Sequence, residues 1–235
     1  MASRRYTSWG LYPRGGQDAV RPNWRHLPLP LADGEARTLL PYGNGRSYGD
    51  SCLNHGGLLL DMRRLDRFID FDAATGMLTC EAGVLLADIL DLVVPRGWML
   101  PVVPGTKFIT VGGAIANDVH GKNHHRRGTF GCHVERFELL RSDGRRLLCS
   151  REQNPDWFRH TIGGLGLTGV ILWCEIKLQP RSGPNLLREV IRFGNIDEFL
   201  TLSRDSDRDY EYSVAWIDAT ATGSALGRGL FERGN

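Results

Sequence analysis

Apolar and polar positions alternate most clearly between residues 170 and 180 of this 235-residue chain. Side chains two positions apart lie on the same face of a strand, so this period predicts a strand buried on one side. The apolar face would carry Val170, Leu172, Cys174, Ile176 and Leu178, and the polar face Glu175, Lys177 and Gln179.

Further strands are predicted where short apolar runs are bounded by turn residues. Residues 57–61 form one such run, and Leu39-Leu40 is expected to end another. Two hairpins are predicted, one from 68–71 and 77–81 around the turn 74–76, the other from 134–140 and 146–149 around Asp143-Gly144. Two more strands are expected at 187–193 and 210–217.

Helices are predicted where apolar residues recur every three or four positions. One helix would place Leu86, Ile89, Leu90 and Val93 on one face and end at Pro95. A second is expected to start with Asn154 as its N-cap and Pro155 in its first turn, and to run through Thr161. A third is expected at 196–202.

These elements follow one another without a regular β-α-β order, which favours an α+β fold over a doubly wound α/β fold. Prolines up to about Asp33 predict an irregular beginning. The run Pro180-Arg181-Ser182-Gly183-Pro184 is the best boundary signal. We therefore predict two domains, 1–180 and 181–235.

Composition narrows the class of protein. A hydrophobic content of 41% and a charged content of 24% are typical of a soluble globular protein. A net charge of +2 is too small to favour nucleic acid or a membrane surface, and no secretory leader or membrane span is visible. Five cysteines without metal-ligand spacing predict inert, buried, reduced thiols in a cytoplasmic protein.

The first of three glycine-rich loops follows the strand at 39–40. It reads Pro41-Tyr42-Gly43-Asn44-Gly45-Arg46-Ser47-Tyr48-Gly49-Asp50-Ser51. Successive N–H groups in such a loop can surround an anion, and Arg46 and Ser47 would suit a pyrophosphate. The spacing of its glycines and the absence of a following helix pattern exclude a Rossmann fingerprint. A surface arginine is the less favoured interpretation of Arg46.

The second loop, 101–121, mixes small and polar residues without a helical or strand period. Gly112 and Gly113 would remove side chains where a ligand approaches, while Thr106, Thr110, Asn117 and His120 would supply hydrogen-bonding groups. An ordinary connection between elements is the alternative. The third loop, 164–169, matches G-x-G-x-x-G but leads into a strand, so no helix is available to hold a phosphate.

Histidines 120, 124 and 125 form the densest cluster of titratable groups. A metal site would need His120 and His124 one helical turn apart, and Gly121 and Gly128 make a helix there unlikely. We therefore predict no metal, and expect His124 and His125 to bond to nearby backbone.

Together, the motifs resemble those of FAD-linked oxidases of the vanillyl-alcohol oxidase type. The most specific are Gly-Arg-Ser-Tyr-Gly-Asp at 45–50 and His-Gly-Lys-Asn-His-His at 120–125, supported by Pro104-Gly105-Thr106, Val111-Gly112-Gly113 and the loop 163–169. Within this superfamily the chain is most similar to the decaprenylphosphoryl-ribose oxidase branch, the flavin subunit of a 2′-epimerase. The resemblance implies a FAD-binding domain of two α+β subdomains, followed by the start of a substrate domain.

The resemblance also implies roles for individual residues. His120 and Tyr48 would be catalytic, and Lys122 and Trp216 would contact the substrate, although Trp216 fits a core position on a strand almost as well. Related oxidases often carry, in place of Arg46, a histidine that bonds covalently to the flavin, so arginine implies non-covalent FAD. The cofactor would be bound by Pro41, Gly43, Asn44, Gly45, Arg46, Ser47, Tyr48, Gly49, Gly105, Thr106, Thr110, Gly112, Gly113, Asn117, Val119, His120 and Ile171.

The implied reaction is oxidation of a secondary sugar hydroxyl, with a polyprenyl-phosphoryl ribose as substrate and a short-chain NAD-dependent reductase as partner. The alternatives are an aldonolactone or alditol oxidase that uses oxygen, and a non-catalytic flavin-binding fragment. Family members are longer, and their catalytic Lys and Cys lie in a part that this chain lacks. We therefore expect these 235 residues alone to bind FAD weakly, if at all, and to oxidise no sugar.

Overall fold

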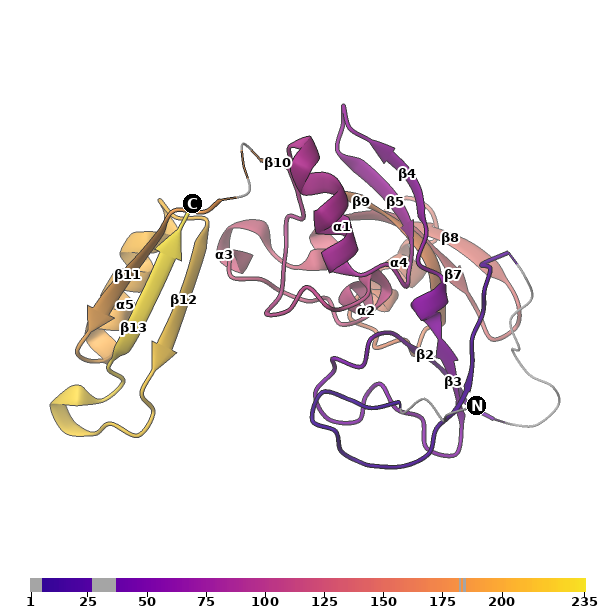
Figure 1. The fold of residues 1–235 in the computed structure, drawn as a ribbon, viewed down its shortest axis with the longest axis horizontal. Coiled ribbons are helices and arrows are strands. Elements are labelled where there is room, and N and C mark those ends of the chain that lie inside the picture. Colours follow the sequence, from indigo (N-terminus) through magenta and orange to yellow (C-terminus); the bar gives the residue numbers. More distant parts are fainter. Residues whose placement is uncertain (1–5, 27–36, 182, 184) are drawn as a thin grey trace.

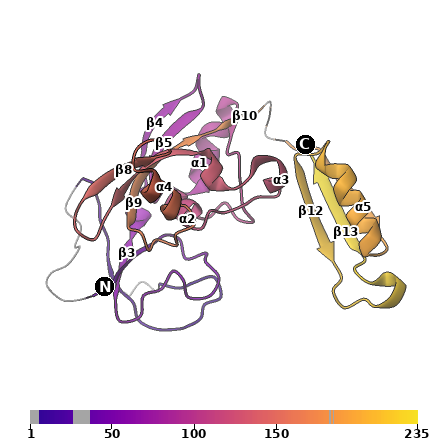
Figure 2. The ribbon, with the colours of Figure 1, turned by 180° about the vertical axis from the view of Figure 1, so that it is seen from behind.

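The computed structural model describes residues 6–26, 37–181, 183 and 185–235. The predictions for residues 1–5, 27–33, Ser182 and Pro184 lie outside this part. Described strands form four sheets, and helices and strands are mixed as an α+β fold requires (Figure 1). In both views, α5 and its three strands lie beside a larger body that contains the other elements (Figures 1 and 2).

The largest sheet has five antiparallel strands in the order β4-β5-β9-β7-β8. Both predicted hairpins are confirmed within it, because β4 pairs with β5 and β7 with β8. The strand that follows the third glycine loop, β9, lies at its centre. The bounds are β4 Phe68–Asp72, β5 Met77–Glu81, β7 Val134–Leu140, β8 Arg146–Ser150 and β9 Val170–Lys177.

Three helices cover one face of this sheet: α1 Leu86–Val93, α2 Val111–Ala116 and α4 Pro155–Thr161. The apolar face predicted for α1 is confirmed, since Leu86, Ile89 and Val93 are fully buried against sheet residues. The helix ends before a 3-10 turn, η2 Val94–Arg96, which contains the expected proline.

The single apolar face predicted for β9 is wrong in its first part. The register between β7 and β9 shifts between Glu138 and Leu139, as at a β-bulge. Cys174 and Ile176 belong to the core under the helices, whereas Val170 and Leu172 pack with Leu60, Met62 and Leu65 in a second cluster. Strict alternation from sequence cannot include the extra residue of a bulge.

A small parallel sheet, ordered β1-β3-β2, carries the first glycine loop. Its strands are β1 Asp18–Val20, β2 Leu39–Tyr42 and β3 Leu58–Asp61, followed by a 3-10 turn, η1 Met62–Arg64. The prediction of irregular chain throughout the N-terminal segment is therefore wrong at β1. This three-residue strand is defined by its pairing with β3, which no local pattern reveals.

Two short helices occur where none was expected. The second glycine loop contains α2, whose N-cap Thr110 accepts a hydrogen bond from Gly113 N–H. One turn of helix, α3 His124–Arg127, lies between the two glycines that argued against it, and Gly128 follows it as the C-cap. Glycines flanking a single turn can end it without interrupting it.

Helix α4 begins as predicted, with Asn154 in the N-cap position and Pro155 as its first residue. Asn154 is left-handed (φ 51°) and makes no capping bond. Its side-chain amide donates instead to the carbonyl of Leu148, 2.8 Å away.

The last sheet, ordered β11-β13-β12, takes its strands only from residues after 187. The strand β13 was not expected, and α5 is longer than the predicted 196–202. Aromatic contacts of Phe199 with Phe193 and Phe231 fix α5 on one face of this sheet. The bounds are β11 Arg188–Phe193, α5 Ile196–Asp207, β12 Tyr212–Ile217, η4 Gly223–Ala225 and β13 Gly229–Gly234.

Glu211 joins this sheet to the histidine-rich segment of the larger body. It accepts two hydrogen bonds from Arg127, at 2.8 and 3.0 Å, and one from the buried Asn123 at 3.1 Å. His125 contacts the carbonyl of Tyr210 at 3.2 Å, as expected for a backbone partner. The remaining elements are β6 Trp98–Met99, η3 Phe130–His133 and β10 Gln179–Pro180.

Candidate functional site

The three glycine loops, far apart in sequence, line one cavity of about 420 Å³. The first loop follows β2, the second includes α2, and the third lies between α4 and β9. Apolar side chains, including Met62, Ile109, Val119 and Ile171, complete the wall. A volume of this size lies in the usual range for small-molecule sites, roughly 300–1,000 Å³.

The first loop has the backbone of an anion-binding turn. Gly45 is left-handed (φ 62°), and a Cβ there would overlap the carbonyl of Thr7 and the hydroxyl of Tyr42. In the described part of the chain, the N–H groups of Asn44, Gly45 and Arg46 donate to no other residue. Arg46 is exposed and forms no ion pair there, bonding only to a backbone carbonyl. The loop therefore offers several donors and one positive charge to a ligand.

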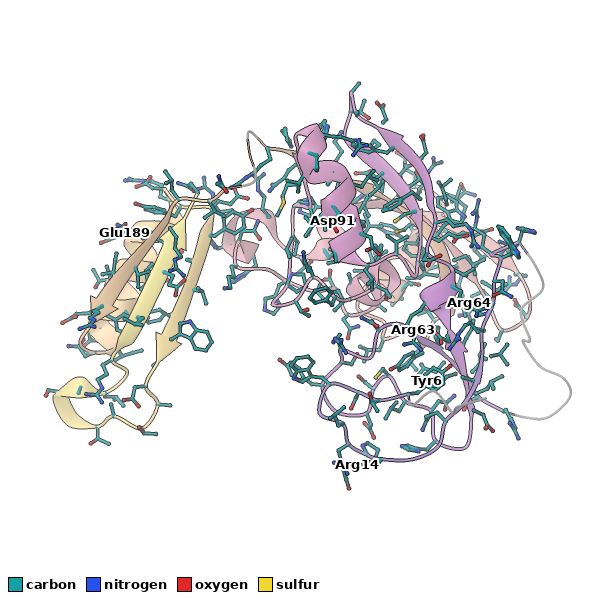
Figure 3. The ribbon with its side chains drawn as sticks, viewed as in Figure 1. Tyr6, Arg14, Arg63, Arg64, Asp91 and Glu189 are labelled. Atoms are coloured by element: carbon teal, nitrogen blue, oxygen red, sulfur yellow. The ribbon has the colours of Figure 1, made fainter. Side chains whose placement is uncertain are left out.

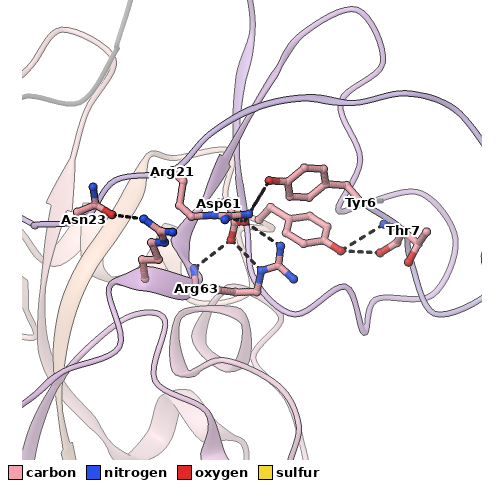
Figure 4. Close-up of polar contacts among 8 residues, drawn as sticks. Tyr6, Thr7, Arg21, Asn23, Asp61 and Arg63 are labelled. Carbon is pink, nitrogen blue, oxygen red and sulfur yellow. Dashed lines mark hydrogen bonds and ion pairs between the residues drawn. The ribbon is translucent and has the colours of Figure 1, made fainter. Parts of the chain in front are cut away.

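Behind this loop lies a fully buried carboxylate, Asp61, at the end of β3 (Figure 4). Arg63 donates to both of its oxygens at 2.8 Å, and Arg21 Nε and the Tyr6 hydroxyl donate to one of them at 2.8 and 3.1 Å. Burial alone would raise the pKa of Asp61, but the bonds from Arg63 and Arg21 outweigh it and lower the pKa to about 2. Asp61 is therefore a carboxylate anion that fixes the side chains of Tyr6, Arg21 and Arg63.

The second loop meets the first where Thr110 lies beside Gly43. A Cβ on Gly43 would overlap the Thr110 hydroxyl. Gly112 lines the cavity, and a Cβ on it would also lie 3.0 Å from both the Cβ and the carbonyl of Ala82. Gly112 allows α2 to approach β5 closely, and its N–H bonds to Ala82 at 2.8 Å.

The third loop seals the cavity against α2. Leu165, itself left-handed (φ 53°), donates its N–H to Ala116 at 2.8 Å, and Gly163 donates to Ile115 at 3.0 Å. Gly169 has φ 148° and approaches the carbonyl of Leu140 closely. Leu165, Gly166 and Gly169 line the cavity, which explains why a G-x-G-x-x-G run is present without a helix after it.

Most of the residues expected to bind the cofactor converge on this cavity. Those that line it are Pro41, Gly43, Asn44, Gly45, Arg46, Ser47, Tyr48, Gly105, Thr106, Thr110, Gly112, Gly113, Asn117, Val119 and Ile171.

Four of the expected site residues lie elsewhere. Gly49 and His120 do not line the cavity, and His120 and Lys122 are both exposed. Trp216, 69% exposed, lines a separate open hollow on β12 and β13. It is therefore no core aromatic of the described chain.

Several lining residues were not predicted, notably Trp9, Ser51, Cys52, Met62, Ala82 and Leu165. The glycine pattern of the third loop could have revealed Leu165. Trp9 and Met62 have no local signal, because they reach the cavity through tertiary contacts.

The prediction of inert buried thiols holds for three of the five cysteines. Cys80, Cys149 and Cys174 are buried, but Cys52 is half-buried in the cavity wall and Cys132 is exposed. Burial raises the pKa of Cys52, so its thiol stays protonated near neutral pH.

The described residues contain neither a metal site nor a membrane-spanning helix. No three His, Cys, Asp or Glu side chains there are close enough to hold a metal. None of the described helices is long and apolar enough to cross a bilayer.

The donors of the first loop and the apolar wall define a site for a phosphate-bearing cofactor with an aromatic ring. The chain belongs to the FAD binding domain family, whose sequence profile matches residues 29–150, more than half of its length. FAD is the cofactor of this family, and the residues present fit it.

Curated relatives agree. The chain is 41% identical over 206 residues to decaprenylphosphoryl-beta-D-ribose oxidase of Mycolicibacterium smegmatis, covering 87% of this chain and 45% of that protein. It is 30% identical over 182 residues to L-gulonolactone oxidase of Mus musculus, covering 74% and 40%. It is 29% identical over 215 residues to cytokinin dehydrogenase 6 of Oryza sativa subsp. japonica, covering 83% and 38%. The chain spans less than half the length of each.

Proposed function

We propose that this chain is the FAD-binding part of an oxidoreductase that oxidises a secondary hydroxyl of a polyprenyl-phosphoryl ribose or a related sugar. The observation that carries the proposal is the single cavity formed by three glycine loops, with free N–H groups and Arg46 at one side and apolar walls elsewhere. The similarity to decaprenylphosphoryl-beta-D-ribose oxidase supports the substrate class.

In this proposal residues 1–180 form the FAD-binding domain and residues 181–235 begin a substrate domain. When bound, FAD supplies an acceptor for hydride from the carbinol carbon. The chain's own groups bind and orient: the N–H groups of residues 44–46 and Arg46 hold phosphate, and Ile109, Val119 and Ile171 exclude water from the ring. His120, Tyr48 and Lys122 are proposed to act on the substrate, and a short-chain NAD-dependent reductase to complete an epimerisation.

Non-covalent attachment is the first expected result. No histidine lines the cavity among the described residues, and the Cys52 thiol is protonated, so neither usual type of nucleophile is available to the flavin. Acid precipitation of the flavin-loaded protein should leave all FAD in the supernatant. Flavin absorbance that stays with the precipitated, washed polypeptide contradicts this.

Anaerobic addition of candidate substrates tests the reaction. In a protein that includes the remainder of the substrate domain, a polyprenyl-phosphoryl ribose should bleach the flavin absorbance, whereas L-gulono-1,4-lactone should not. The lactone is a real competitor because L-gulonolactone oxidase is also a relative. Bleaching by the lactone alone assigns the aldonolactone reaction instead, and bleaching by neither supports a binding fragment.

A further inference from the structure

Residues 6–9, which we call the strap, cross directly behind the first glycine loop. The Tyr42 hydroxyl donates to the carbonyl of Thr7 at 2.8 Å and lies 3.3 Å from the Thr7 N–H, which donates to it. Trp9 N–H donates to the carbonyl of Ser47 at 3.1 Å. The strap precedes the segment matched by the family profile, residues 29–150.

The strap is fixed from its other end by the buried carboxylate. Tyr6 bonds to Asp61, its ring contacts that of Tyr42 edge-on at 5.1 Å, and the Arg63 guanidinium lies over both rings at 5.5 and 5.2 Å. Figure 3 places Tyr6 and Arg63 on the same side of the larger body. A network with this many charge-assisted bonds leaves the strap little freedom.

The strap affects the cavity in two ways. The left-handed turn at Gly45 rests on Thr7 and Tyr42, so the strap fixes the direction of the loop's N–H groups. The Trp9 side chain, 56% exposed, itself lines the cavity, and its ring lies 5.8 Å from the guanidinium carbon of Arg46. An aromatic ring beside an arginine attracts the guanidinium and restrains its position.

We propose that the strap is part of the FAD site: Thr7 and Tyr42 fix the phosphate-binding turn, and Trp9 acts with Arg46 as a wall of the cofactor cavity. This inference rests on the proposed function and adds to it a cofactor-binding element that the glycine loops do not contain. Trp9 is the binding residue, and Tyr42 is a positioning residue that acts through the backbone.

The test is FAD titration of the 235-residue chain and its variants, followed by flavin fluorescence. Trp9→Ala should weaken binding about tenfold, Trp9→Phe much less, and Tyr42→Phe about fivefold. Trp24→Ala is the matched control: Trp24 is 46% exposed and contacts Arg67 at 4.0 Å, but it does not line the cavity. Its FAD affinity should be unchanged.

Thermal unfolding without FAD separates binding from folding, because the largely exposed Trp9 should contribute little to stability. In the double variant, Trp9→Ala with Arg46→Gln, the loss should be smaller than the product of the single losses, since the two side chains act together. If the parent chain binds FAD and Trp9→Ala binds it equally well, or Trp24→Ala weakens it equally, the strap inference is wrong. If the parent chain binds no FAD up to millimolar concentration, the same titration is made with a protein that includes the remainder of the substrate domain, and no binding there overturns the proposed function as well.

Discussion

Replacing Gly45 with valine should abolish FAD binding, lowering the affinity by more than about 100-fold. A β-branched residue is strongly disfavoured at φ 62°. Its Cβ would also overlap the Thr7 carbonyl and the Tyr42 hydroxyl, so the turn must move away from the strap. Because the N–H groups of residues 44–46 depend on that turn, they would no longer point at one anion.

The control for this substitution is Gly144→Val. Gly144 has φ 83°, lies in the β7–β8 turn, and has no atom within 4 Å of a Cβ. In the Gly144→Val variant, valine is also forced into a left-handed backbone, but its side chain collides with nothing and lies outside the cavity. This variant should therefore bind FAD as the parent chain does. Equilibrium dialysis with FAD measures both variants, and circular dichroism checks folding. A folded Gly45→Val protein with parental affinity would show that the loop holds no phosphate.

Elements with a long apolar period were predictable from sequence because burial of one face determines them. The amphipathic helix α1 and both hairpins have the expected bounds within about a residue. The short elements were not predictable in the same way. One-turn α3 and three-residue β1 contain too few residues for a period, and tertiary contacts define them.

The residues of the site also differ in whether the local sequence reveals them. Glycine loops were recognisable because positive φ and close approach leave a local signature, as at Gly45 and Gly169. The packing reason for a particular glycine was not visible in the sequence: a Cβ on Gly112 would press against Ala82. Trp9 gave no signal, since Arg46 and Ser47 are far from it in sequence. Arg63 is close to Asp61 in sequence, but Arg21 and Tyr6 lie 40 and 55 positions away from it.

Removing the carboxylate in Asp61→Ala should lower the free energy of unfolding by about 3 kcal/mol, the lower end of the range for breaking a buried pair. Arg21 and Arg63 would each lose their partner while only 20% and 33% exposed. That partial exposure lets water relieve some of the cost. Asp209→Ala is the control, because its pair with Arg208 is exposed on both sides and should contribute little to stability. Urea denaturation at pH 7 measures both.

The pH dependence of the same pair of proteins identifies the cause. The pKa of Asp61 is about 2 in the folded chain, below its ordinary value of 3.8, so its stabilising effect is complete above about pH 4 and is lost as the pH falls towards 2. Other carboxylates titrate in both proteins and cancel in the difference. The stability gap between parent and Asp61→Ala should therefore be constant from pH 7 to about 4 and narrow between 4 and 2. A gap that stays constant down to pH 2 would show that Asp61 stabilises the fold by packing and not by its charge.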